Sequence, residues 1–377
     1  MVTLDERHST RGRAHMLFEM MRGDVITDGW RSDEVKDSLD LCLACKACKK
    51  ECPTHVDMAS YKAEFMSHYY DGRLRSREAY VFGWLHRWLM LGRPLSALAN
   101  FVTHTPGLRV LAKRLAGIAT ERDIPRIAPR SFRRAFRAAT GEPNARRVIL
   151  WPDTFNDSFH PEVLHDAVRV LTAARCTVEI PRRRLCCGRP LYEYGFLDDA
   201  RRLWRTTLDT LANDIVLGTP IIVLEPSCAS AFRDELPALF PDDTLPAKLA
   251  HNAVTLAEFL DADGFEPHRA TSRHLLYHRH CHQEPLLSPH KEVEMLARAG
   301  HHVDVLDSGC CGMAGAFGFQ RAKYDLSVAL AERVLLPAVR AAPEATIVAD
   351  GFSCREQLRQ LGGVRARHFA ELLAEGL

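Results

Sequence analysis

The sequence predicts an α-helical N-terminal domain followed by an α/β C-terminal half built from two copies of one unit. Three observations support this fold class. Residues 1–120 carry apolar side chains at helical spacing and show no convincing strand pattern. From Val148 onward, short β-type runs alternate with helical patterns, as in βαβ units with a parallel sheet. The same elements then recur in the same order, which indicates a duplication.

The composition is typical of a globular protein with large cores. With 377 residues, 46% of them hydrophobic, the chain is long enough for two or three domains. The 50 basic residues nearly balance 48 acidic ones, and the formal charge is +2. We therefore expect no nucleic-acid partner, since such proteins carry a strong basic field.

Within the N-terminal domain, Ser9 or Thr10 is placed to cap a first helix. Further on, an apolar stripe follows helical spacing at Tyr80, Trp84, Trp88 and Leu91. We expect it to pack into its own domain, with contact to a membrane or a partner as the alternative. Charged residues interrupt the apolar stretch 81–102, so it lacks the roughly 20 apolar residues of a spanning helix. Any membrane contact is therefore expected to be peripheral.

Residues 121–147 have the composition of a linker rich in Arg and Pro. Eight Arg lie between Arg122 and Arg147, and three prolines interrupt the segment at Pro125, Pro129 and Pro143. We expect a solvated surface here, with a docking patch for an acidic partner as the alternative.

The first repeat, residues 148–265, contains expected strands over 148–151, 177–180 and 221–224 and a helix over 161–174. Cys186, Cys187 and Gly188 follow the second strand, and Cys228 follows the third. Cys176, on the second strand, is expected to be an ordinary core residue.

The second repeat, residues 266–377, contains expected strands over 275–277, 303–306 and 346–349 and helices over 293–298 and 323–334. Cys310 and Cys311 follow its second strand and Cys354 follows its third, as in the first repeat. An additional cysteine, Cys281, follows its first strand. The interval from the Cys-Cys-Gly motif to the later cysteine is 41 residues in the first repeat and 43 in the second. Such similar spacing supports the duplication.

The strongest local motif is a C-x2-C-x2-C-x3-C-P run formed by Cys42, Cys45, Cys48 and Cys52. This is the bacterial ferredoxin pattern for a [4Fe–4S] cluster, so the N-terminal domain is expected to be of the ferredoxin type. Zinc is the rival metal, although zinc sites usually need two separated pairs. The charged N-terminus has no secretory signal pattern, so a reducing cytoplasm is expected, where clustered cysteines bind metals.

The single run leaves one question open. In two-cluster ferredoxins the fourth cysteine of a run binds the other cluster. Either Cys52 closes the cluster of its own run, or a partner motif lies upstream or in a neighbouring chain.

The cysteines of the repeats follow strands that we expect to be parallel, and ligands bind at that edge of an open sheet. In the second repeat four thiols, a complete set for a [4Fe–4S] cluster, are expected to meet there. The first repeat offers only Cys186, Cys187 and Cys228, and near Asp153 no thiol takes the place of Cys281. The histidines around Cys281 are open candidates for ligands or proton carriers: His278, His280 and His282.

The segments 185–190 and 308–315 resemble the CCG-domain family of iron–sulfur proteins. The similarity is closest to the C-terminal region of FAD-linked D-2-hydroxy-acid dehydrogenases, through segments 8–14, 28–33, 224–228 and 349–356. The resemblance implies an electron-transfer protein that works beside an FAD-dependent dehydrogenase, either a separate subunit or a missing upstream domain. The final acceptor stays open among a quinone, a cytochrome and a flavoprotein.

Two departures from that family qualify the resemblance. The related proteins carry a second C-x2-C-x2-C-x3-C-P run before the segment that resembles residues 8–14. Heterodisulfide reductase relatives end each repeat in C-x2-C, whereas Glu225 and Gly351 occupy the first of those positions here. Two alternatives to electron transfer stay open: thiol–disulfide chemistry in the repeats, and a structural metal protein used for docking.

Overall fold

The computed structural model describes residues 2–137 and 145–377, so Pro143 of the expected linker lies outside the described residues. Residues 2–120 contain helices and no strand, as predicted. Ser9 caps the first helix, since its Oγ accepts from the Gly12 amide at 2.8 Å. The helices of this region are α1 (Thr10–Arg22), α2 (Asp33–Asp40), α3 (Ala47–Glu51), α4 (Met58–Tyr69), α5 (Arg77–Gly83), α6 (Leu85–Gly92), α7 (Ser96–His104) and α8 (Leu108–Ala116).

The first repeat folds around a parallel sheet in the order β2-β1-β3-β4. Its strands are β1 (Arg146–Trp151), β2 (Cys176–Glu179), β3 (Ile221–Val223) and β4 (Ala253–Val254). The sequence analysis predicted the first three and missed β4, because a strand of two residues leaves no alternating pattern. Helix α9 (Phe132–Ala135) lies in the preceding segment 121–147, and the helices of the repeat are α10 (Thr154–Ser158), α11 (Pro161–Ala173), α12 (Arg189–Glu193), α13 (Leu197–Val216), α14 (Pro226–Ser230), α15 (Leu236–Leu239), α16 (Thr244–Asn252) and α17 (Leu256–Ala262).

The second repeat has a parallel sheet in the order β6-β5-β7, the same arrangement as β2-β1-β3. Its strands are β5 (His274–His278), β6 (His302–Leu306) and β7 (Thr346–Val348). Its helices are α18 (Gln283–Leu286), α19 (His290–Arg298), α20 (Tyr324–Ala331), α21 (Leu335–Ala341), α22 (Phe352–Gly362) and α23 (Phe369–Glu375). The predicted duplication and its parallel sheets are therefore confirmed.

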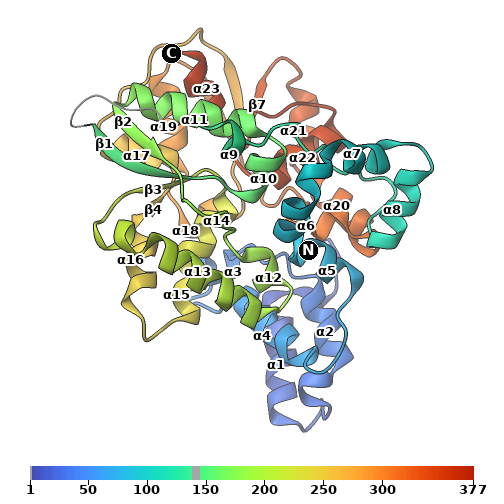
Figure 1. Cartoon of the computed structure of the whole chain (residues 1–377). Helices are drawn as coiled ribbons and strands as arrows, with labels where there is room; N and C mark the ends of the chain where they lie inside the picture. The colour runs from blue at the N-terminus through green and yellow to red at the C-terminus, as the bar shows by residue number, and fades with distance from the viewer. Residues whose placement is uncertain (1, 138–144) are drawn as a thin grey trace.

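The inner faces of the two sheets share one hydrophobic core, and the outer face of each sheet packs in a core of its own. Successive side chains of a strand alternate between the two faces. Val148 and Leu150 of β1 point into the shared core with Leu275 of β5, and Ile149 points into the core under α13. Helices α11 and α17 of the first repeat pack on α23 and α19 of the second (Figure 1). The repeats thus fix each other's orientation.

The carboxyl ends of the two sheets face each other across polar contacts. The Phe352 amide of the second repeat donates to Oε2 of Glu225 in the first, at 2.8 Å. Nη2 of Arg355 donates to Oδ1 of Asn156 across the same boundary at 2.7 Å. The cysteine-bearing loops of both repeats therefore open toward one region of the molecule.

Two sequence interpretations need correction. The Arg-rich segment 121–147 is not simply solvated where it is described, because Arg122 is buried and donates to the Gly318 carbonyl and Phe132 is completely buried. In the apolar stripe, Trp84 packs against Phe196, but Trp88 is 53% exposed. Among the described residues no helix is both long and apolar enough to cross a bilayer.

Candidate metal centres

Cys42 and Cys45 lie in the loop between α2 and α3, and Cys48 lies in the first turn of α3. Ala44 and Lys46 have left-handed backbones, with φ of 50° and 63°, which non-glycine residues rarely adopt. The three thiols line one cavity of about 240 Å³. The strained turn therefore gathers three of the four thiols of the run, the arrangement that a metal cluster requires.

Cys52 lies apart from the other three thiols and does not line their cavity. Its sulfur contacts Oγ1 of Thr54 at 3.2 Å, and this contact lowers the pKa of Cys52. The geometry agrees with the alternative in which the fourth cysteine serves a different cluster.

Three buried lysines surround the Cys42–Cys48 loop. Lys62 donates to the Cys42 carbonyl at 2.9 Å, and Lys323 donates to the Asp40 carbonyl at 3.0 Å. Lys46 is 1% exposed within the loop itself. Each of these lysines also pairs with a carboxylate: Lys46 with Asp57, Asp234 and Glu235, Lys62 with Glu193, and Lys323 with Asp40. The protein itself therefore balances their charges, and their contribution here is to hold the loop by hydrogen bonds to its carbonyls.

In the second repeat, the predicted thiols meet at the carboxyl edge of the sheet. Cys281 follows β5, Cys310 and Cys311 follow β6, and Cys354 lies in the first turn of α22. Side-chain contacts link them in series, from Cys281 to Cys310, then to Cys311 and Cys354. The Cys310 contact lowers the pKa of Cys281 to about 7, and contacts from Cys310 and then Cys354 hold the pKa of Cys311 well below its usual value. The contact with Cys281 raises the pKa of Cys310, and the contact with Cys311 raises the pKa of Cys354, both well above the usual value. The four sulfurs thus share their protons as one group, and the thiolate is the form that binds a metal.

All three candidate histidines lie beside this sulfur group, since ring nitrogens of His280 and His282 and the Cys281 sulfur lie within 4.8 Å of one another. The ring of His278 and the sulfurs of Cys311 and Cys354 lie within 4.8 Å of one another. Nδ1 of His278 contacts Oγ of Ser308 at 2.6 Å, and its buried Nε2 has no partner among the described residues. His278 is therefore available as a ligand or as a hydrogen-bond donor to a cluster.

The first repeat places its three thiols in the same way. Cys186 and Cys187 follow β2, Cys228 lies in the first turn of α14, and Cys187 contacts both others. Burial raises the pKa of Cys228 to about 12. Gly188 has a left-handed backbone with φ of 74°. Nε1 of Trp204 donates to the Cys187 carbonyl at 2.5 Å. The same indole nitrogen occupies the space that a Cβ at position 188 would fill. The glycine of the motif is therefore required by packing.

A carboxylate stands where the fourth thiol of the first repeat would be. Asp153 follows β1 and is completely buried, and its Oδ1 caps α10 by accepting from the Phe155 and Asn156 amides at 3.0 and 2.9 Å. Burial, and then the nearby Glu225, raise the pKa of Asp153 to about 7. The first repeat thus offers three thiols and a carboxylate that is already used as a helix cap.

The two positions that depart from the C-x2-C pattern both have structural roles. Glu225 caps α14 and also accepts from the Phe352 amide of the other repeat. Gly351 lies against His280, and a Cβ at position 351 would approach Nε2 of that ring to 2.9 Å. The space of an additional cysteine is therefore occupied in the second repeat by an imidazole.

We predict that Gly351→Ala lowers the free energy of unfolding by about 1–3 kcal/mol, because the added methyl group overlaps the buried His280 ring. Chemical denaturation measures this change. Gly92→Ala is the control, since its Cβ would meet no atom within 4 Å and φ is −77°. That control is expected to be neutral or slightly stabilising. Equal stability of the two variants would contradict the packing argument.

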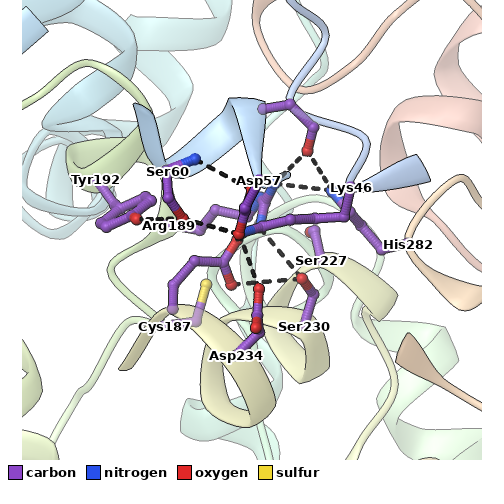
Figure 2. A network of polar contacts seen from close by, with 12 residues as sticks. Lys46, Asp57, Ser60, Cys187, Arg189, Tyr192, Ser227, Ser230, Asp234 and His282 are labelled. Atoms are coloured by element: carbon purple, nitrogen blue, oxygen red, sulfur yellow. Dashed lines mark hydrogen bonds and ion pairs between the residues drawn. The ribbon is translucent and has the colours of Figure 1, made fainter. Parts of the chain in front are cut away.

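A buried ionic network fixes the N-terminal loop to both repeats (Figure 2). Nζ of Lys46 lies 2.6 Å from Asp57 and 2.8 Å from Asp234. Arg189, which directly follows the first Cys-Cys-Gly motif, pairs with Glu235 and donates to the Ala44 carbonyl at 2.8 Å. The sequence analysis missed these residues, although a charged residue inside or directly after a cysteine motif was a usable signal.

The network also reaches the second repeat. Nη2 of Arg189 lies 2.7 Å from Nε2 of His282, beside Cys281. Nε2 of His282 also lies 2.9 Å from the carbonyl oxygen of Ala44, so the N-terminal run is close to the second repeat at Cys45 and Cys281. Burial first, and then the Cys281 sulfur, raise the pKa of Cys45 to about 12. Two cysteine sites more than 200 residues apart in sequence are therefore neighbours in space.

Cys176 behaves as expected for a core residue. It lies on β2, is 1% exposed and packs in the core shared by the two sheets. The remaining eleven cysteines all belong to the motifs described above.

Residues 153–233 and 275–359 both match the CCG cysteine-rich domain. Lactate utilization protein A of Bacillus subtilis is 30% identical over 190 residues, which cover 47% of this chain and 76% of that protein. The chain belongs to the CCG cysteine-rich domain family. The residues present fit this assignment, because thiols converge in each repeat and iron–sulfur clusters are held by thiolates.

Two further relatives match nearly the whole chain. The glycolate oxidase iron–sulfur subunit of Bacillus subtilis is 23% identical, and the match covers 98% of this chain and 88% of that protein. D-2-hydroxyglutarate dehydrogenase of Escherichia coli is 25% identical over 91% of this chain. The chain spans only about a third of the length of that dehydrogenase, 35%.

Proposed function

We propose that this CCG protein is an iron–sulfur electron-transfer component that receives electrons from an FAD-linked 2-hydroxy-acid dehydrogenase and passes them to a separate acceptor. The observation that carries the proposal is a contact between two cysteine motifs from distant parts of the chain: Nε2 of His282, next to Cys281, lies 2.9 Å from the carbonyl oxygen of Ala44, next to Cys45. Electron transfer needs centres that lie close together, whereas a structural metal site gains nothing from such a neighbour. The similarity to the glycolate oxidase iron–sulfur subunit supports the same chemistry.

The proposed ligands form two principal sites. Cys42, Cys45 and Cys48 would hold one [4Fe–4S] cluster in the N-terminal domain, with Cys52 directed to a second cluster of the same type. Cys281, Cys310, Cys311 and Cys354 would hold a cluster in the second repeat. Cys186, Cys187 and Cys228 are a weaker third set, since Asp153 already caps a helix. A bound cluster supplies a one-electron redox centre, and the protein contributes burial, charge and hydrogen bonds that set its potential.

The proposal keeps the boundaries expected from the sequence: a ferredoxin-type domain over 1–120, a connecting segment over 121–147, and repeats over 148–265 and 266–377. The dehydrogenase would be a separate subunit or another part of a longer chain, working in the reducing cytoplasm. The position of Glu225 as a cap and of His280 against Gly351 weighs against the disulfide chemistry of C-x2-C relatives.

Anaerobic purification followed by iron and sulfide analysis tests the proposal. We expect acid-labile sulfide, a brown visible absorption, and an electron paramagnetic resonance signal after reduction with dithionite. Colourless protein with stoichiometric zinc would refute the proposal and support a structural metal protein instead. Turnover of a disulfide without any flavoprotein would support thiol–disulfide chemistry.

We further propose that helices α6–α8 rest on an anionic membrane surface. An apolar patch of nine exposed side chains covers these helices: Trp88, Met90, Leu91, Leu95, Leu98, Phe101, Leu108, Leu111 and Leu115. The segment from residue 79 to residue 120 contains no Asp or Glu, and Arg87, Arg109 and Arg114 are exposed within it. Apolar side chains combined with basic ones are typical of helices that lie in a membrane interface.

We predict that Trp88→Glu weakens binding to vesicles containing anionic phospholipid at least about tenfold, because a large apolar side chain is replaced by a negative charge. Cosedimentation with the vesicles measures the bound fraction. Leu217→Glu, at an exposed position after α13, is the matched control and is expected to bind like the unmodified protein. Binding to neutral vesicles that equals binding to anionic ones would contradict the role of the arginines. Self-association without vesicle binding would show that the patch joins two copies of this chain.

A further inference from the structure

Two histidines and an aspartate lie together on the outer face of the second sheet, away from the cysteine sites. His274 is the first residue of β5, and His302 and Asp304 lie on the neighbouring edge strand β6. His274 and His302 are paired directly in the register of the two parallel strands. Because successive side chains of a strand alternate between faces, His302 and Asp304 project from the same face. That face is the outer one, since Leu276, two residues after His274, packs in the outer core.

The distances between these three side chains suit a single metal ion. One ring nitrogen of each histidine and one carboxylate oxygen of Asp304 all lie within 4.8 Å of one another. Nε2 of His274 lies 2.7 Å from Oδ2 of Asp304, and the centroids of the two imidazole rings are 5.3 Å apart. Ligand atoms that surround a tetrahedral ion at about 2 Å lie roughly 3.3 Å from each other. Small rotations of the side chains therefore complete such a site.

The first repeat shows which side chains these positions carry when no metal ligand is present. Strand register gives the three counterparts there: Arg147, Thr177 and Glu179. Nη2 of Arg147 donates to Oε2 of Glu179 at 2.9 Å, an ordinary ion pair across the two strands. In the second repeat all three positions carry side chains that bind metals. An ion pair alone does not account for a histidine at position 302, whose ring makes no hydrogen bond within residues 2–137 and 145–377.

The chemistry of the ligands favours zinc. Imidazole nitrogens and a carboxylate oxygen are common zinc ligands, whereas the thiolates at the opposite edge of the same sheet suit iron–sulfur clusters. The side chains of His274 and Asp304 are 44% and 54% exposed, so an ion reaches them directly from solvent. Three protein ligands leave the fourth position of a tetrahedral ion to water.

We propose that His274, His302 and Asp304 bind one zinc ion, with water as the fourth ligand. The ion would replace the hydrogen bond between His274 and Asp304 as the link between β5 and the edge strand β6. This site is independent of the proposed electron transfer, because it lies at the amino ends of the strands and none of its residues is a proposed cluster ligand.

The test measures Zn²⁺ binding to the anaerobically purified protein, prepared without a histidine tag, by equilibrium dialysis against buffered Zn²⁺ and metal analysis. We expect about one zinc ion per chain. X-ray absorption at the zinc edge should show nitrogen and oxygen neighbours at about 2.0–2.1 Å and no sulfur neighbour at about 2.3 Å.

Two variants each remove one ligand without disturbing the sheet. His302→Thr introduces the side chain that the first repeat carries at this place, and Asp304→Asn keeps the shape of the side chain. Each is expected to weaken zinc binding at least about tenfold, since changes in residues that only support a ligand already cost about 10–100-fold. His251→Ala is the matched control, because it removes an exposed histidine at the end of α16, and its affinity should equal that of the unmodified protein.

The outcomes separate this proposal from the proposed function. Iron and sulfide contents should be the same in all four proteins. Absence of zinc binding, sulfur neighbours around the zinc, or equal affinity in His302→Thr would each overturn the zinc site and leave the proposed function standing. Absence of iron and sulfide would refute the proposed function, and the zinc neighbours together with His302→Thr would still decide whether this site exists.

Discussion

Cys45→Ser protein, purified without oxygen, is expected to lose about four iron and four sulfide ions per chain, the content of one [4Fe–4S] cluster. The physical reason is that Cys42, Cys45 and Cys48 line one cavity, so that removing one thiolate leaves two ligands for the cluster. Iron and sulfide analysis measures the loss, and the electron paramagnetic resonance signal of the reduced protein identifies the site that is missing.

Two matched variants sharpen this experiment. Cys176→Ala removes a buried cysteine that packs in the core, and it is expected to keep its full iron content. Cys52→Ser is expected to leave the signal of the Cys42–Cys45–Cys48 site in place, because Cys52 lies apart from these thiols. Unchanged iron in Cys45→Ser would refute the proposed N-terminal site.

Arg189→Met is expected to lower the free energy of unfolding by about 3–5 kcal/mol, the usual cost of removing one partner of a buried ion pair. Arg189 is 6% exposed and its partner Glu235 is 1% exposed, so the remaining carboxylate would be left buried with weaker compensation. The loop carbonyl of Ala44 would lose its donor as well. Chemical denaturation of the variant and the unmodified protein measures the change.

Removing the second charge tests the cause of this loss. The double variant Arg189→Met with Glu235→Gln should recover part of the stability, since no uncompensated carboxylate stays buried. Arg340→Met is the control, because its pair with Glu332 is exposed, and its stability should not change measurably. If Arg189→Met were as stable as Arg340→Met, the network would have no part in holding the domains together.

The local motifs determined much of what this protein contains. The two Cys-Cys-Gly motifs and the alternation of strands and helices predicted the parallel sheets and the duplication, and these elements are confirmed. The spacing of the cysteine run predicted a ferredoxin-type site, which stays a prediction. Such features follow from nearby residues, because strand and helix patterns repeat over 2 and 3.6 residues and a cysteine motif spans a single turn. They are therefore readable in one chain.

Long-range contacts were decided only by the tertiary structure. The proximity of Cys45 to Cys281, the pairing of Arg189 with Glu235, and the position of His280 against Gly351 each join residues more than 40 positions apart. No periodicity records which loops meet at the facing edges of two sheets, because that depends on how the shared core packs. The sequence thus specified which thiols are present, and the packing of the repeats determined which of them are neighbours.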